Sequence, residues 1–138
     1  MTEKNSFETV RPVRQSFMQI FESVVEYTEA KNITLHRSGN ADPQAIELCK
    51  IITEVLMFDP DEKIIIAKER MQASTVQDVF RQLRSEHLEL VLFSFSNGIH
   101  YIANKRAYLR TALYNAFFEH EFYYSNLVKS DMAKELPK

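Results

Sequence analysis

The chain of 138 residues contains few of the residues that interrupt regular structure, with only two glycines and four prolines. A β-sandwich or barrel needs a turn signal every ~8–12 residues, so this scarcity argues against both folds. Two glycines are also too few for a glycine-rich phosphate-binding loop. With 45% hydrophobic and 26% charged residues, the composition is typical of a globular, helix-rich domain.

Long apolar runs and a secretory leader are missing as well. No run approaches the ~18 apolar residues of a membrane span, and the first residues lack a basic segment followed by an apolar one. The single cysteine, Cys49, has no partner for an internal disulfide, and its apolar surroundings in the sequence favour a small buried hydrophobe. We therefore expect a cytoplasmic protein that makes no membrane contact.

The sequence also lacks the residue patterns of catalytic and metal sites. The histidines stand far apart, and none has a second ligand at metal-binding spacing. His120-Glu121 lacks the second histidine of a zinc-protease helix, and no nucleophile motif occurs. We expect no enzyme activity, no metal and no cofactor. The isolated histidines are His36, His87, His100 and His120.

Apolar residues at helical spacing predict a mainly α fold, a compact bundle of about five to six helices. Asp42 and Pro43 match an N-cap and a first-turn proline, and Ser74 or Thr75 and then Ser85 match later caps. Asn97-Gly98 is suited to the left-handed turn that ends a helix. The predicted helices cover about residues 12–30, 43–58, 76–83, 86–96 and 102–116.

A short β-branched stretch interrupts the helical pattern. Residues 63–66, Lys-Ile-Ile-Ile, predict a strand, which we expect to pair with residues 33–35 in a two-stranded ribbon. The remaining pattern predicts one helical domain over residues 11–128, with flexible ends at residues 1–10 and 129–138.

Charge is distributed unevenly along a chain whose net charge is −2. Residues 1–60 carry 6 Lys or Arg against 9 Asp or Glu, residues 61–118 carry 8 against 6, and residues 119–138 carry 3 against 4. A nucleic-acid-binding domain is usually clearly basic, so any DNA contact would be local, weak and sensitive to salt.

The predicted helix over residues 102–116 has one apolar and one cationic side. Its apolar stripe consists of Tyr108, Leu109, Ala112, Leu113 and Ala116. The basic residues beside the stripe are Lys105, Arg106 and Arg110. The pattern alone favours a core-facing helix with a solvated basic flank, and phosphate binding by that flank is the alternative.

The amino-acid sequence of this helix resembles that of a known family. The segment Asn-Lys-Arg-Ala-Tyr-Leu-Arg-Thr-Ala-Leu-Tyr-Asn-Ala, residues 104–116, is similar to the closing helix of the C-terminal module of replication initiator A proteins of Gram-positive plasmids and conjugative elements. That module is in turn similar to the DnaD-like helical domains of primosome proteins. Further stretches resemble the family in the same order, namely Lys31–Ile33, Asp42–Leu56, Lys63–Glu69, Val76–Leu83 and Glu86–Leu92.

The resemblance implies a DnaD-like bundle that assists replication initiation or helicase-loader assembly, through contacts with replication proteins and weak DNA binding. A chain of this length has no room for the winged-helix domain that reads the origin in such initiators, so we expect no origin recognition. After Asn32-Ile33, Leu35-His36 also replaces the Tyr-Asp pair that is typical of the family. The expected nucleic-acid-binding residues are Lys105, Arg106, Arg110, Arg81 and Arg84.

Aromatic residues at the end of the chain suggest protein contacts. They are dense between residues 108 and 124, where they are most often used to dock a last helix on a core. The alternative function is a standalone regulatory protein of a mobile element that binds a host protein without touching DNA, or a homo-oligomer. Its contacts would use the acidic first helix and these aromatics. The expected partner-binding residues are Tyr108, Tyr114, Tyr123 and Tyr124.

Overall fold

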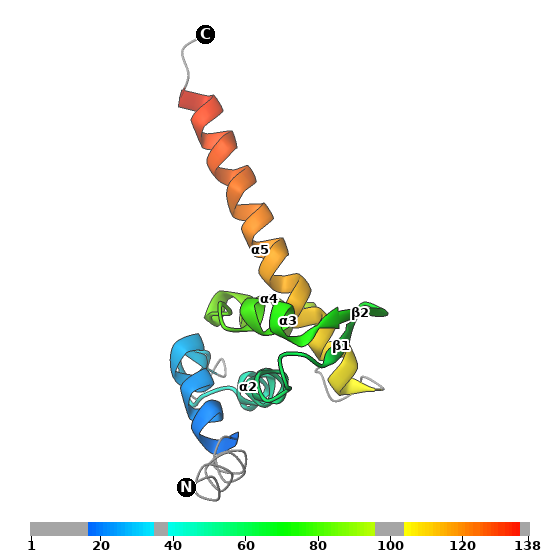
Figure 1. Cartoon of the computed structure of the whole chain (residues 1–138). Helices are drawn as coiled ribbons and strands as arrows, with labels where there is room; N and C mark the ends of the chain where they lie inside the picture. The colour runs from blue at the N-terminus through cyan, green and yellow to red at the C-terminus, as the bar shows by residue number, and fades with distance from the viewer. Residues whose placement is uncertain (1–16, 35–38, 96–103, 136–138) are drawn as a thin grey trace, which may run out of the picture.

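The computed structural model describes residues 17–34, 39–95 and 104–135, with side chains described up to residue 120. A helix covers residues 17–28 and is followed by the 3-10 turn η1 (Ala30–Asn32) and helix α2 (Pro43–Leu56). Then come strands β1 (Lys63–Ile66) and β2 (Glu69–Gln72) and helices α3 (Ala73–Phe80), α4 (Ser85–Ser94) and α5 (Lys105–Glu135) (Figure 1). The expectation of a mainly helical bundle with a short two-stranded ribbon is confirmed.

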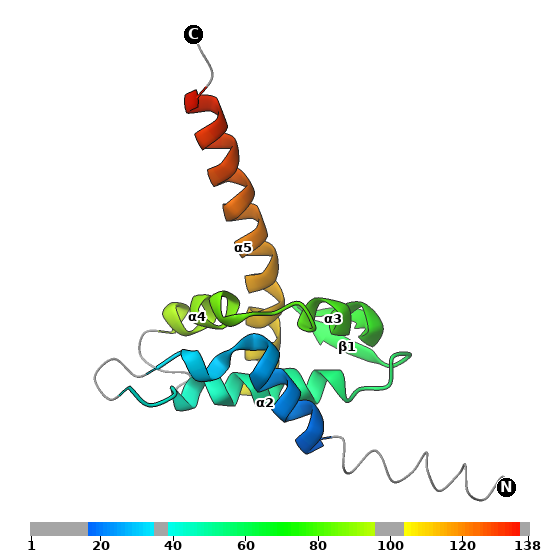
Figure 2. The same cartoon turned by 90° about the vertical axis from the view of Figure 1, so that its left-hand side faces the viewer.

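Helix α5 packs against the other elements and joins them into one core. Its first half contacts α2, α3, α4 and β1. Leu109 and Leu113 are fully buried on the side facing these elements, as the apolar stripe predicted, whereas Tyr108 is exposed. Both views show the second half of α5 extending beyond the other elements (Figures 1 and 2).

Helix α2 is the other central element of the core. Asp42 is its N-cap and accepts a hydrogen bond of 2.9 Å from the backbone of Gln44, and Pro43 occupies the first turn as predicted. Its buried face includes Cys49, and helix 17–28 contributes Val24 and Thr28 beside it. The buried side of α2 consists of Ala45, Leu48, Cys49, Ile51, Ile52, Thr53 and Val55.

The predicted partner of strand β1 is wrong. Lys63–Ile66 pairs antiparallel with Glu69–Gln72, and Thr34 instead forms an isolated bridge with Ala41. The two residues between the strands, Ala67 and Lys68, both have positive φ, 52° and 69°, which is the backbone of a tight hairpin turn. Pairing of adjacent strands also closes a much shorter loop than pairing with residues 33–35.

Several helix boundaries differ from the predicted ones, most of all the end of α5, which lies at Glu135 and not near residue 116. Helix α3 begins at Ala73 with Gln72 as N-cap, so neither Ser74 nor Thr75 caps it. The N-cap of α4 is Arg84, one residue before Ser85. The predicted stop at residues 97–98 lies outside the described residues, and α4 ends at Ser94.

Candidate functional site

The cationic flank of α5 faces the acidic side of α2. Lys105 forms an ion pair with Glu47, and Arg106 Nη2 lies 3.4 Å from Glu54 Oε2. Glu47 and Glu54 are seven residues apart, or about two helical turns, so both lie on the same side of α2. The Arg106 side chain keeps 71% of its surface exposed, because Glu54 contacts only one end of it. The structure therefore brings these cations together, but next to carboxylates of the same chain.

Arg110 is used differently from its two neighbours. Its guanidinium carbon lies 5.5 Å from the centroid of the Phe58 ring, at the end of α2, within the range of a cation–π contact. Its Nε is buried and has no hydrogen-bond partner among the described residues. Arg110 thus packs the start of α5 against the end of α2.

Arg81 and Arg84 lie at the junction of α3 and α4. Arg81 Nη1 is 3.2 Å from the Asp78 carboxylate, and both side chains are more than half exposed. Arg84 donates from Nη1 to the carbonyls of Leu83, at 2.8 Å, and Arg81, at 3.2 Å. Its guanidinium carbon lies 5.3 Å from the centroid of the Tyr27 ring. The two arginines therefore lie beside helix 17–28, held by contacts different from those of the α5 cations.

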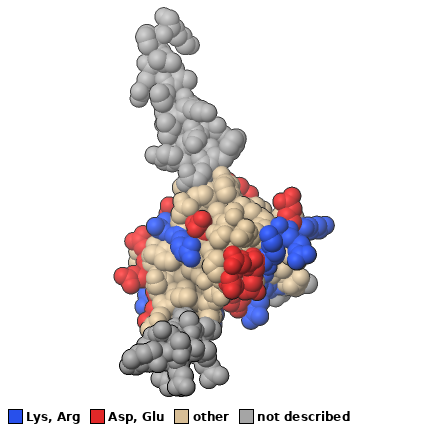
Figure 3. All heavy atoms as spheres, viewed as in Figure 1, with Lys and Arg blue, Asp and Glu red and all other residues tan. Residues whose placement is uncertain are grey.

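Among the described residues, the face in Figure 3 has no continuous basic field. Blue side chains gather toward the β1–β2 hairpin, with red side chains next to them (Figure 3). The hairpin carries three exposed cations, Lys63, Lys68 and Arg70, which the sequence interpretation did not include. Exposed glutamates at positions 62 and 69 lie within the same stretch. The surface charge is thus mixed, in keeping with the net charge of −2.

We call the cavity between helix 17–28, the end of α2 and the α3–α4 junction the arginine groove. Its volume is about 570 Å³. The Tyr27 hydroxyl donates a hydrogen bond of 2.9 Å to the Phe80 carbonyl, which fixes this ring within the groove. Burial raises the pKa of Tyr27 to about 12, although the Arg84 charge opposes the shift. The groove is lined by Gln19, Ile20, Ser23, Val24, Tyr27, Leu56, Arg81 and Arg84.

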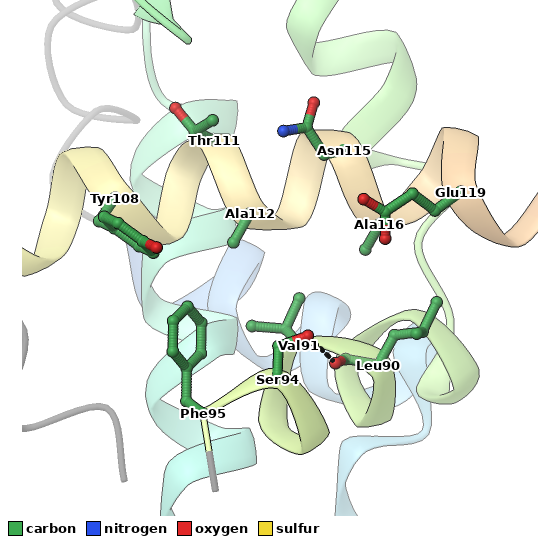
Figure 4. A pocket seen from close by; sticks show the side chains of 10 residues that line it. All are labelled: Leu90, Val91, Ser94, Phe95, Tyr108, Thr111, Ala112, Asn115, Ala116 and Glu119. Atoms are coloured by element: carbon green, nitrogen blue, oxygen red, sulfur yellow. Dashed lines mark hydrogen bonds between the residues drawn. The ribbon is translucent and has the colours of Figure 1, made fainter. Parts of the chain in front are cut away.

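A second cavity, the α4–α5 groove, has a volume of about 370 Å³ (Figure 4). Tyr108 and Phe95 stand at one end with their ring centroids 5.4 Å apart, and Glu119 lies toward the other end. Tyr108, on α5, is 54% exposed, and Phe93, on α4, is 85% exposed. The remaining lining residues are Leu90, Val91, Ser94, Thr111, Ala112, Asn115 and Ala116.

Two of the four predicted partner-binding tyrosines have described side chains, and these two lie in different surroundings. Tyr108 lines the α4–α5 groove, whereas the ring of Tyr114 is half-buried and packs against Phe118 with the centroids 5.1 Å apart. The side chains of Tyr123 and Tyr124 lie outside the described residues, although α5 continues through both positions.

The interpretation of the histidines as isolated is wrong for one pair. The rings of His87, on α4, and His120, on α5, have centroids 4.9 Å apart. Potential ligand atoms of His87, His120 and Glu86 lie within 4.8 Å of one another. Thirty-three positions separate the two histidines, so no local spacing could have indicated the pair.

This histidine pair does not fit a bound metal ion as it stands. His87 Nδ1 accepts a hydrogen bond of 2.8 Å from the backbone N–H of Arg84, at the start of α4. A neutral imidazole that accepts at Nδ1 carries its proton on Nε2, so neither ring nitrogen of His87 has a lone pair left for a metal ion. Metal binding would therefore require loss of the hydrogen bond that caps α4.

None of the helices in the described part of the chain has both the length and the apolar composition that crossing a lipid bilayer requires.

Comparison with known proteins gives one match. No curated protein and no solved structure matches the chain. A family pattern does match residues 13–135, which is most of the chain. The protein therefore belongs to DUF6017, a family of unknown function.

Proposed function

We propose that the protein is a non-catalytic module of DNA replication in a plasmid or mobile element. In this role it assists initiation or helicase-loader assembly, mainly by binding other proteins and only weakly by binding DNA. The replication context comes from the resemblance of residues 104–116 and the earlier stretches to replication initiator A proteins, and the mainly helical fold agrees with that resemblance.

The ion pairs between α5 and α2 are the reason why we place protein binding ahead of DNA binding. Lys105 and Arg106 contact Glu47 and Glu54. Arg81 pairs with Asp78, so three of the five expected DNA-binding cations have carboxylates of the same chain beside them. A phosphate would have to compete with these carboxylates, and the net charge of −2 gives little long-range attraction. The exposed part of Arg106 is the cation best placed for a weak, salt-sensitive DNA contact.

The α4–α5 groove supports protein binding more directly. Exposed aromatic side chains at the rim of an apolar groove are typical of protein–protein contact sites. Tyr108 provides such a side chain, and Phe95 forms part of the groove wall. Phe93 is a further exposed aromatic residue of α4, outside the lining of the groove. The same feature also supports the alternative, a standalone regulator of a host protein, because the groove itself does not specify the partner.

The test uses the purified protein together with the purified initiator and helicase loader from the same source organism, all treated with nuclease. We expect one of the two proteins to bind in biolayer interferometry. The double variant Phe93→Ala with Tyr108→Ala should weaken this binding at least about tenfold. Ile65→Ala is the matched control, because Ile65 is an exposed apolar residue on the hairpin.

DNA binding is measured in parallel by fluorescence anisotropy with single- and double-stranded oligonucleotides across a salt series. We expect weak binding with a negative salt slope, reduced alike for all sequences by Arg106→Ala. If neither replication protein nor DNA binds, the replication role is overturned. A nuclease-resistant complex with a defined host protein outside replication would instead establish the alternative.

A further inference from the structure

The arginine groove combines an apolar floor with two cations at its edge. Val24 is fully buried at its base, and Ile20 and Leu56 pack against the core beside it. The Tyr27 ring forms part of the same floor and is held by its hydrogen bond to Phe80. An occupant that fills this floor must therefore carry apolar groups.

The edge of the groove favours a negatively charged occupant. Arg84 is held by two backbone carbonyls through Nη1 and by the Tyr27 ring, so its guanidinium is already positioned. Arg81 pairs with Asp78, but the two side chains are 56% and 76% exposed. An ion pair this exposed contributes little stability, so another carboxylate can replace Asp78 at small cost.

The size and chemistry of the groove select among possible occupants. A volume of about 570 Å³ suits a few side chains, as in small-ligand pockets, rather than the broad face of a folded domain. A nucleic-acid backbone has no apolar groups for Ile20, Val24 and Leu56, and Arg84 already covers the Tyr27 ring on which a base could stack. An acidic peptide with apolar side chains satisfies both the floor and the edge.

We propose that the arginine groove binds a short linear segment of a partner protein, in which one or two apolar side chains lie on the floor and a carboxylate contacts Arg81 and Arg84. This site is separate from the α4–α5 groove. The inference rests on the proposed function as a protein-binding module, and it assigns a binding chemistry to a surface that the function alone does not specify.

The experiment selects binders from a random twelve-residue peptide library displayed on phage, with the full chain immobilised. We expect the enriched peptides to share apolar residues next to Asp or Glu. Arg81→Glu should weaken their binding at least about tenfold by placing a like charge opposite the carboxylate. Ser23→Trp should weaken it similarly without any change of charge, because Ser23 is an exposed residue of the groove wall and the indole would fill the space.

Arg70→Glu is the matched control, since it makes the same charge change at an exposed arginine on β2, and it should leave peptide affinity within about twofold. Circular dichroism confirms that each variant is folded. Enriched peptides without acidic residues, or binding that survives both Arg81→Glu and Ser23→Trp, would overturn the proposal. If light scattering shows that Ser23→Trp converts a dimer to a monomer, a second copy of the chain occupies the groove. If single-stranded DNA competes with the peptides, the groove binds nucleic acid. Either result also overturns the proposal.

The same variants distinguish this proposal from the proposed function. If the initiator or loader binds equally well to Arg81→Glu and Ser23→Trp, and no acidic peptide is enriched, the arginine groove fails while the replication role stands. If acidic peptides bind in the groove but neither replication protein does, the groove stands and the replication role fails.

Discussion

The side-chain amide of Gln77, on α3, donates a hydrogen bond of 2.7 Å to the backbone carbonyl of Phe58, just beyond the end of α2. The same nitrogen lies 3.1 Å from the carbonyl oxygen of Val55. The last carbonyls of a helix have no partner within it, and Gln77, which is buried, supplies one from a neighbouring element. A single side chain thus closes α2 and joins it to α3.

We predict that Gln77→Leu lowers the free energy of unfolding by about 2 kcal/mol, because it keeps the volume but removes the side-chain donor to the Phe58 carbonyl. Urea denaturation measures the effect. Gln82→Ala is the control, since Gln82 bonds the Asp78 carbonyl at the surface and its loss should cost less than about 0.5 kcal/mol. Equal costs for the two variants would contradict the role given to Gln77.

A second prediction concerns alkaline pH. Burial raises the pKa of Tyr27 from 10.0 to about 12, and burial raises the pKa of the Cys49 thiol from 9.0 to about 11. Both groups are held in their neutral, protonated forms in the folded protein, Cys49 buried and Tyr27 partly buried, so their contribution to stability is complete below pH 9 and is lost as the pH rises through 9 to 12. The free energy of unfolding should therefore fall steadily above about pH 9.

Urea denaturation at several pH values checks this alkaline loss. Cys49→Ala should remove the part of this stability loss that begins near pH 9. Tyr27→Phe should remove the part that begins near pH 10. A free energy of unfolding that stays constant between pH 8 and about pH 11 would contradict the burial of both groups.

The hairpin turn allows a stabilising substitution. Lys68 has φ of 69°, a conformation that glycine adopts without the steric cost that a Cβ imposes. We predict that Lys68→Gly raises the free energy of unfolding by about 1 kcal/mol, as measured by urea denaturation. Lys68→Ala is the matched control, because it removes the same charge but keeps the Cβ. A gain of the same size in both variants would assign the effect to charge instead.

The last prediction separates the apolar from the ionic contacts of α5. Leu113→Ala should cost about 2–5 kcal/mol, since Leu113 is fully buried against the core. Arg106→Ala should cost less than about 1 kcal/mol, because its ion pair with Glu54 is largely solvated. Thermal or urea unfolding of both variants measures the difference. A larger loss for Arg106→Ala would mean that ion pairs, not apolar packing, hold α5.

The sequence predicted the features that depend on neighbouring residues. The apolar stripes around Cys49 and Leu113 follow a 3.6-residue period, and the cap at Asp42 depends on a single turn of chain, so both could be recognised locally. The hairpin partner of β1 was missed because its turn uses Ala67 and Lys68, where Asn-Gly is the usual signal.

The candidate sites depend on contacts between distant parts of the sequence, and these were not predictable. Lys105 was expected to be a solvated cation, but its partner Glu47 lies 58 residues earlier. The arginine groove joins Tyr27 to Arg81 and Arg84, which no repeat or spacing connects. Helical periodicity gives the face on which a side chain lies, but not the element that this face meets.

The position of α5 in the chain affects how the protein matures. During synthesis, residues 17–95 leave the ribosome before the segment that carries Leu109, Leu113 and Ala116. Until that segment emerges, the buried sides of α2, α3, α4 and β1 lack the helix that contacts them all. The apolar sides of these elements therefore stay uncovered until the first turns of α5 have left the ribosome, and this interval is when chaperones or aggregation would act on the chain.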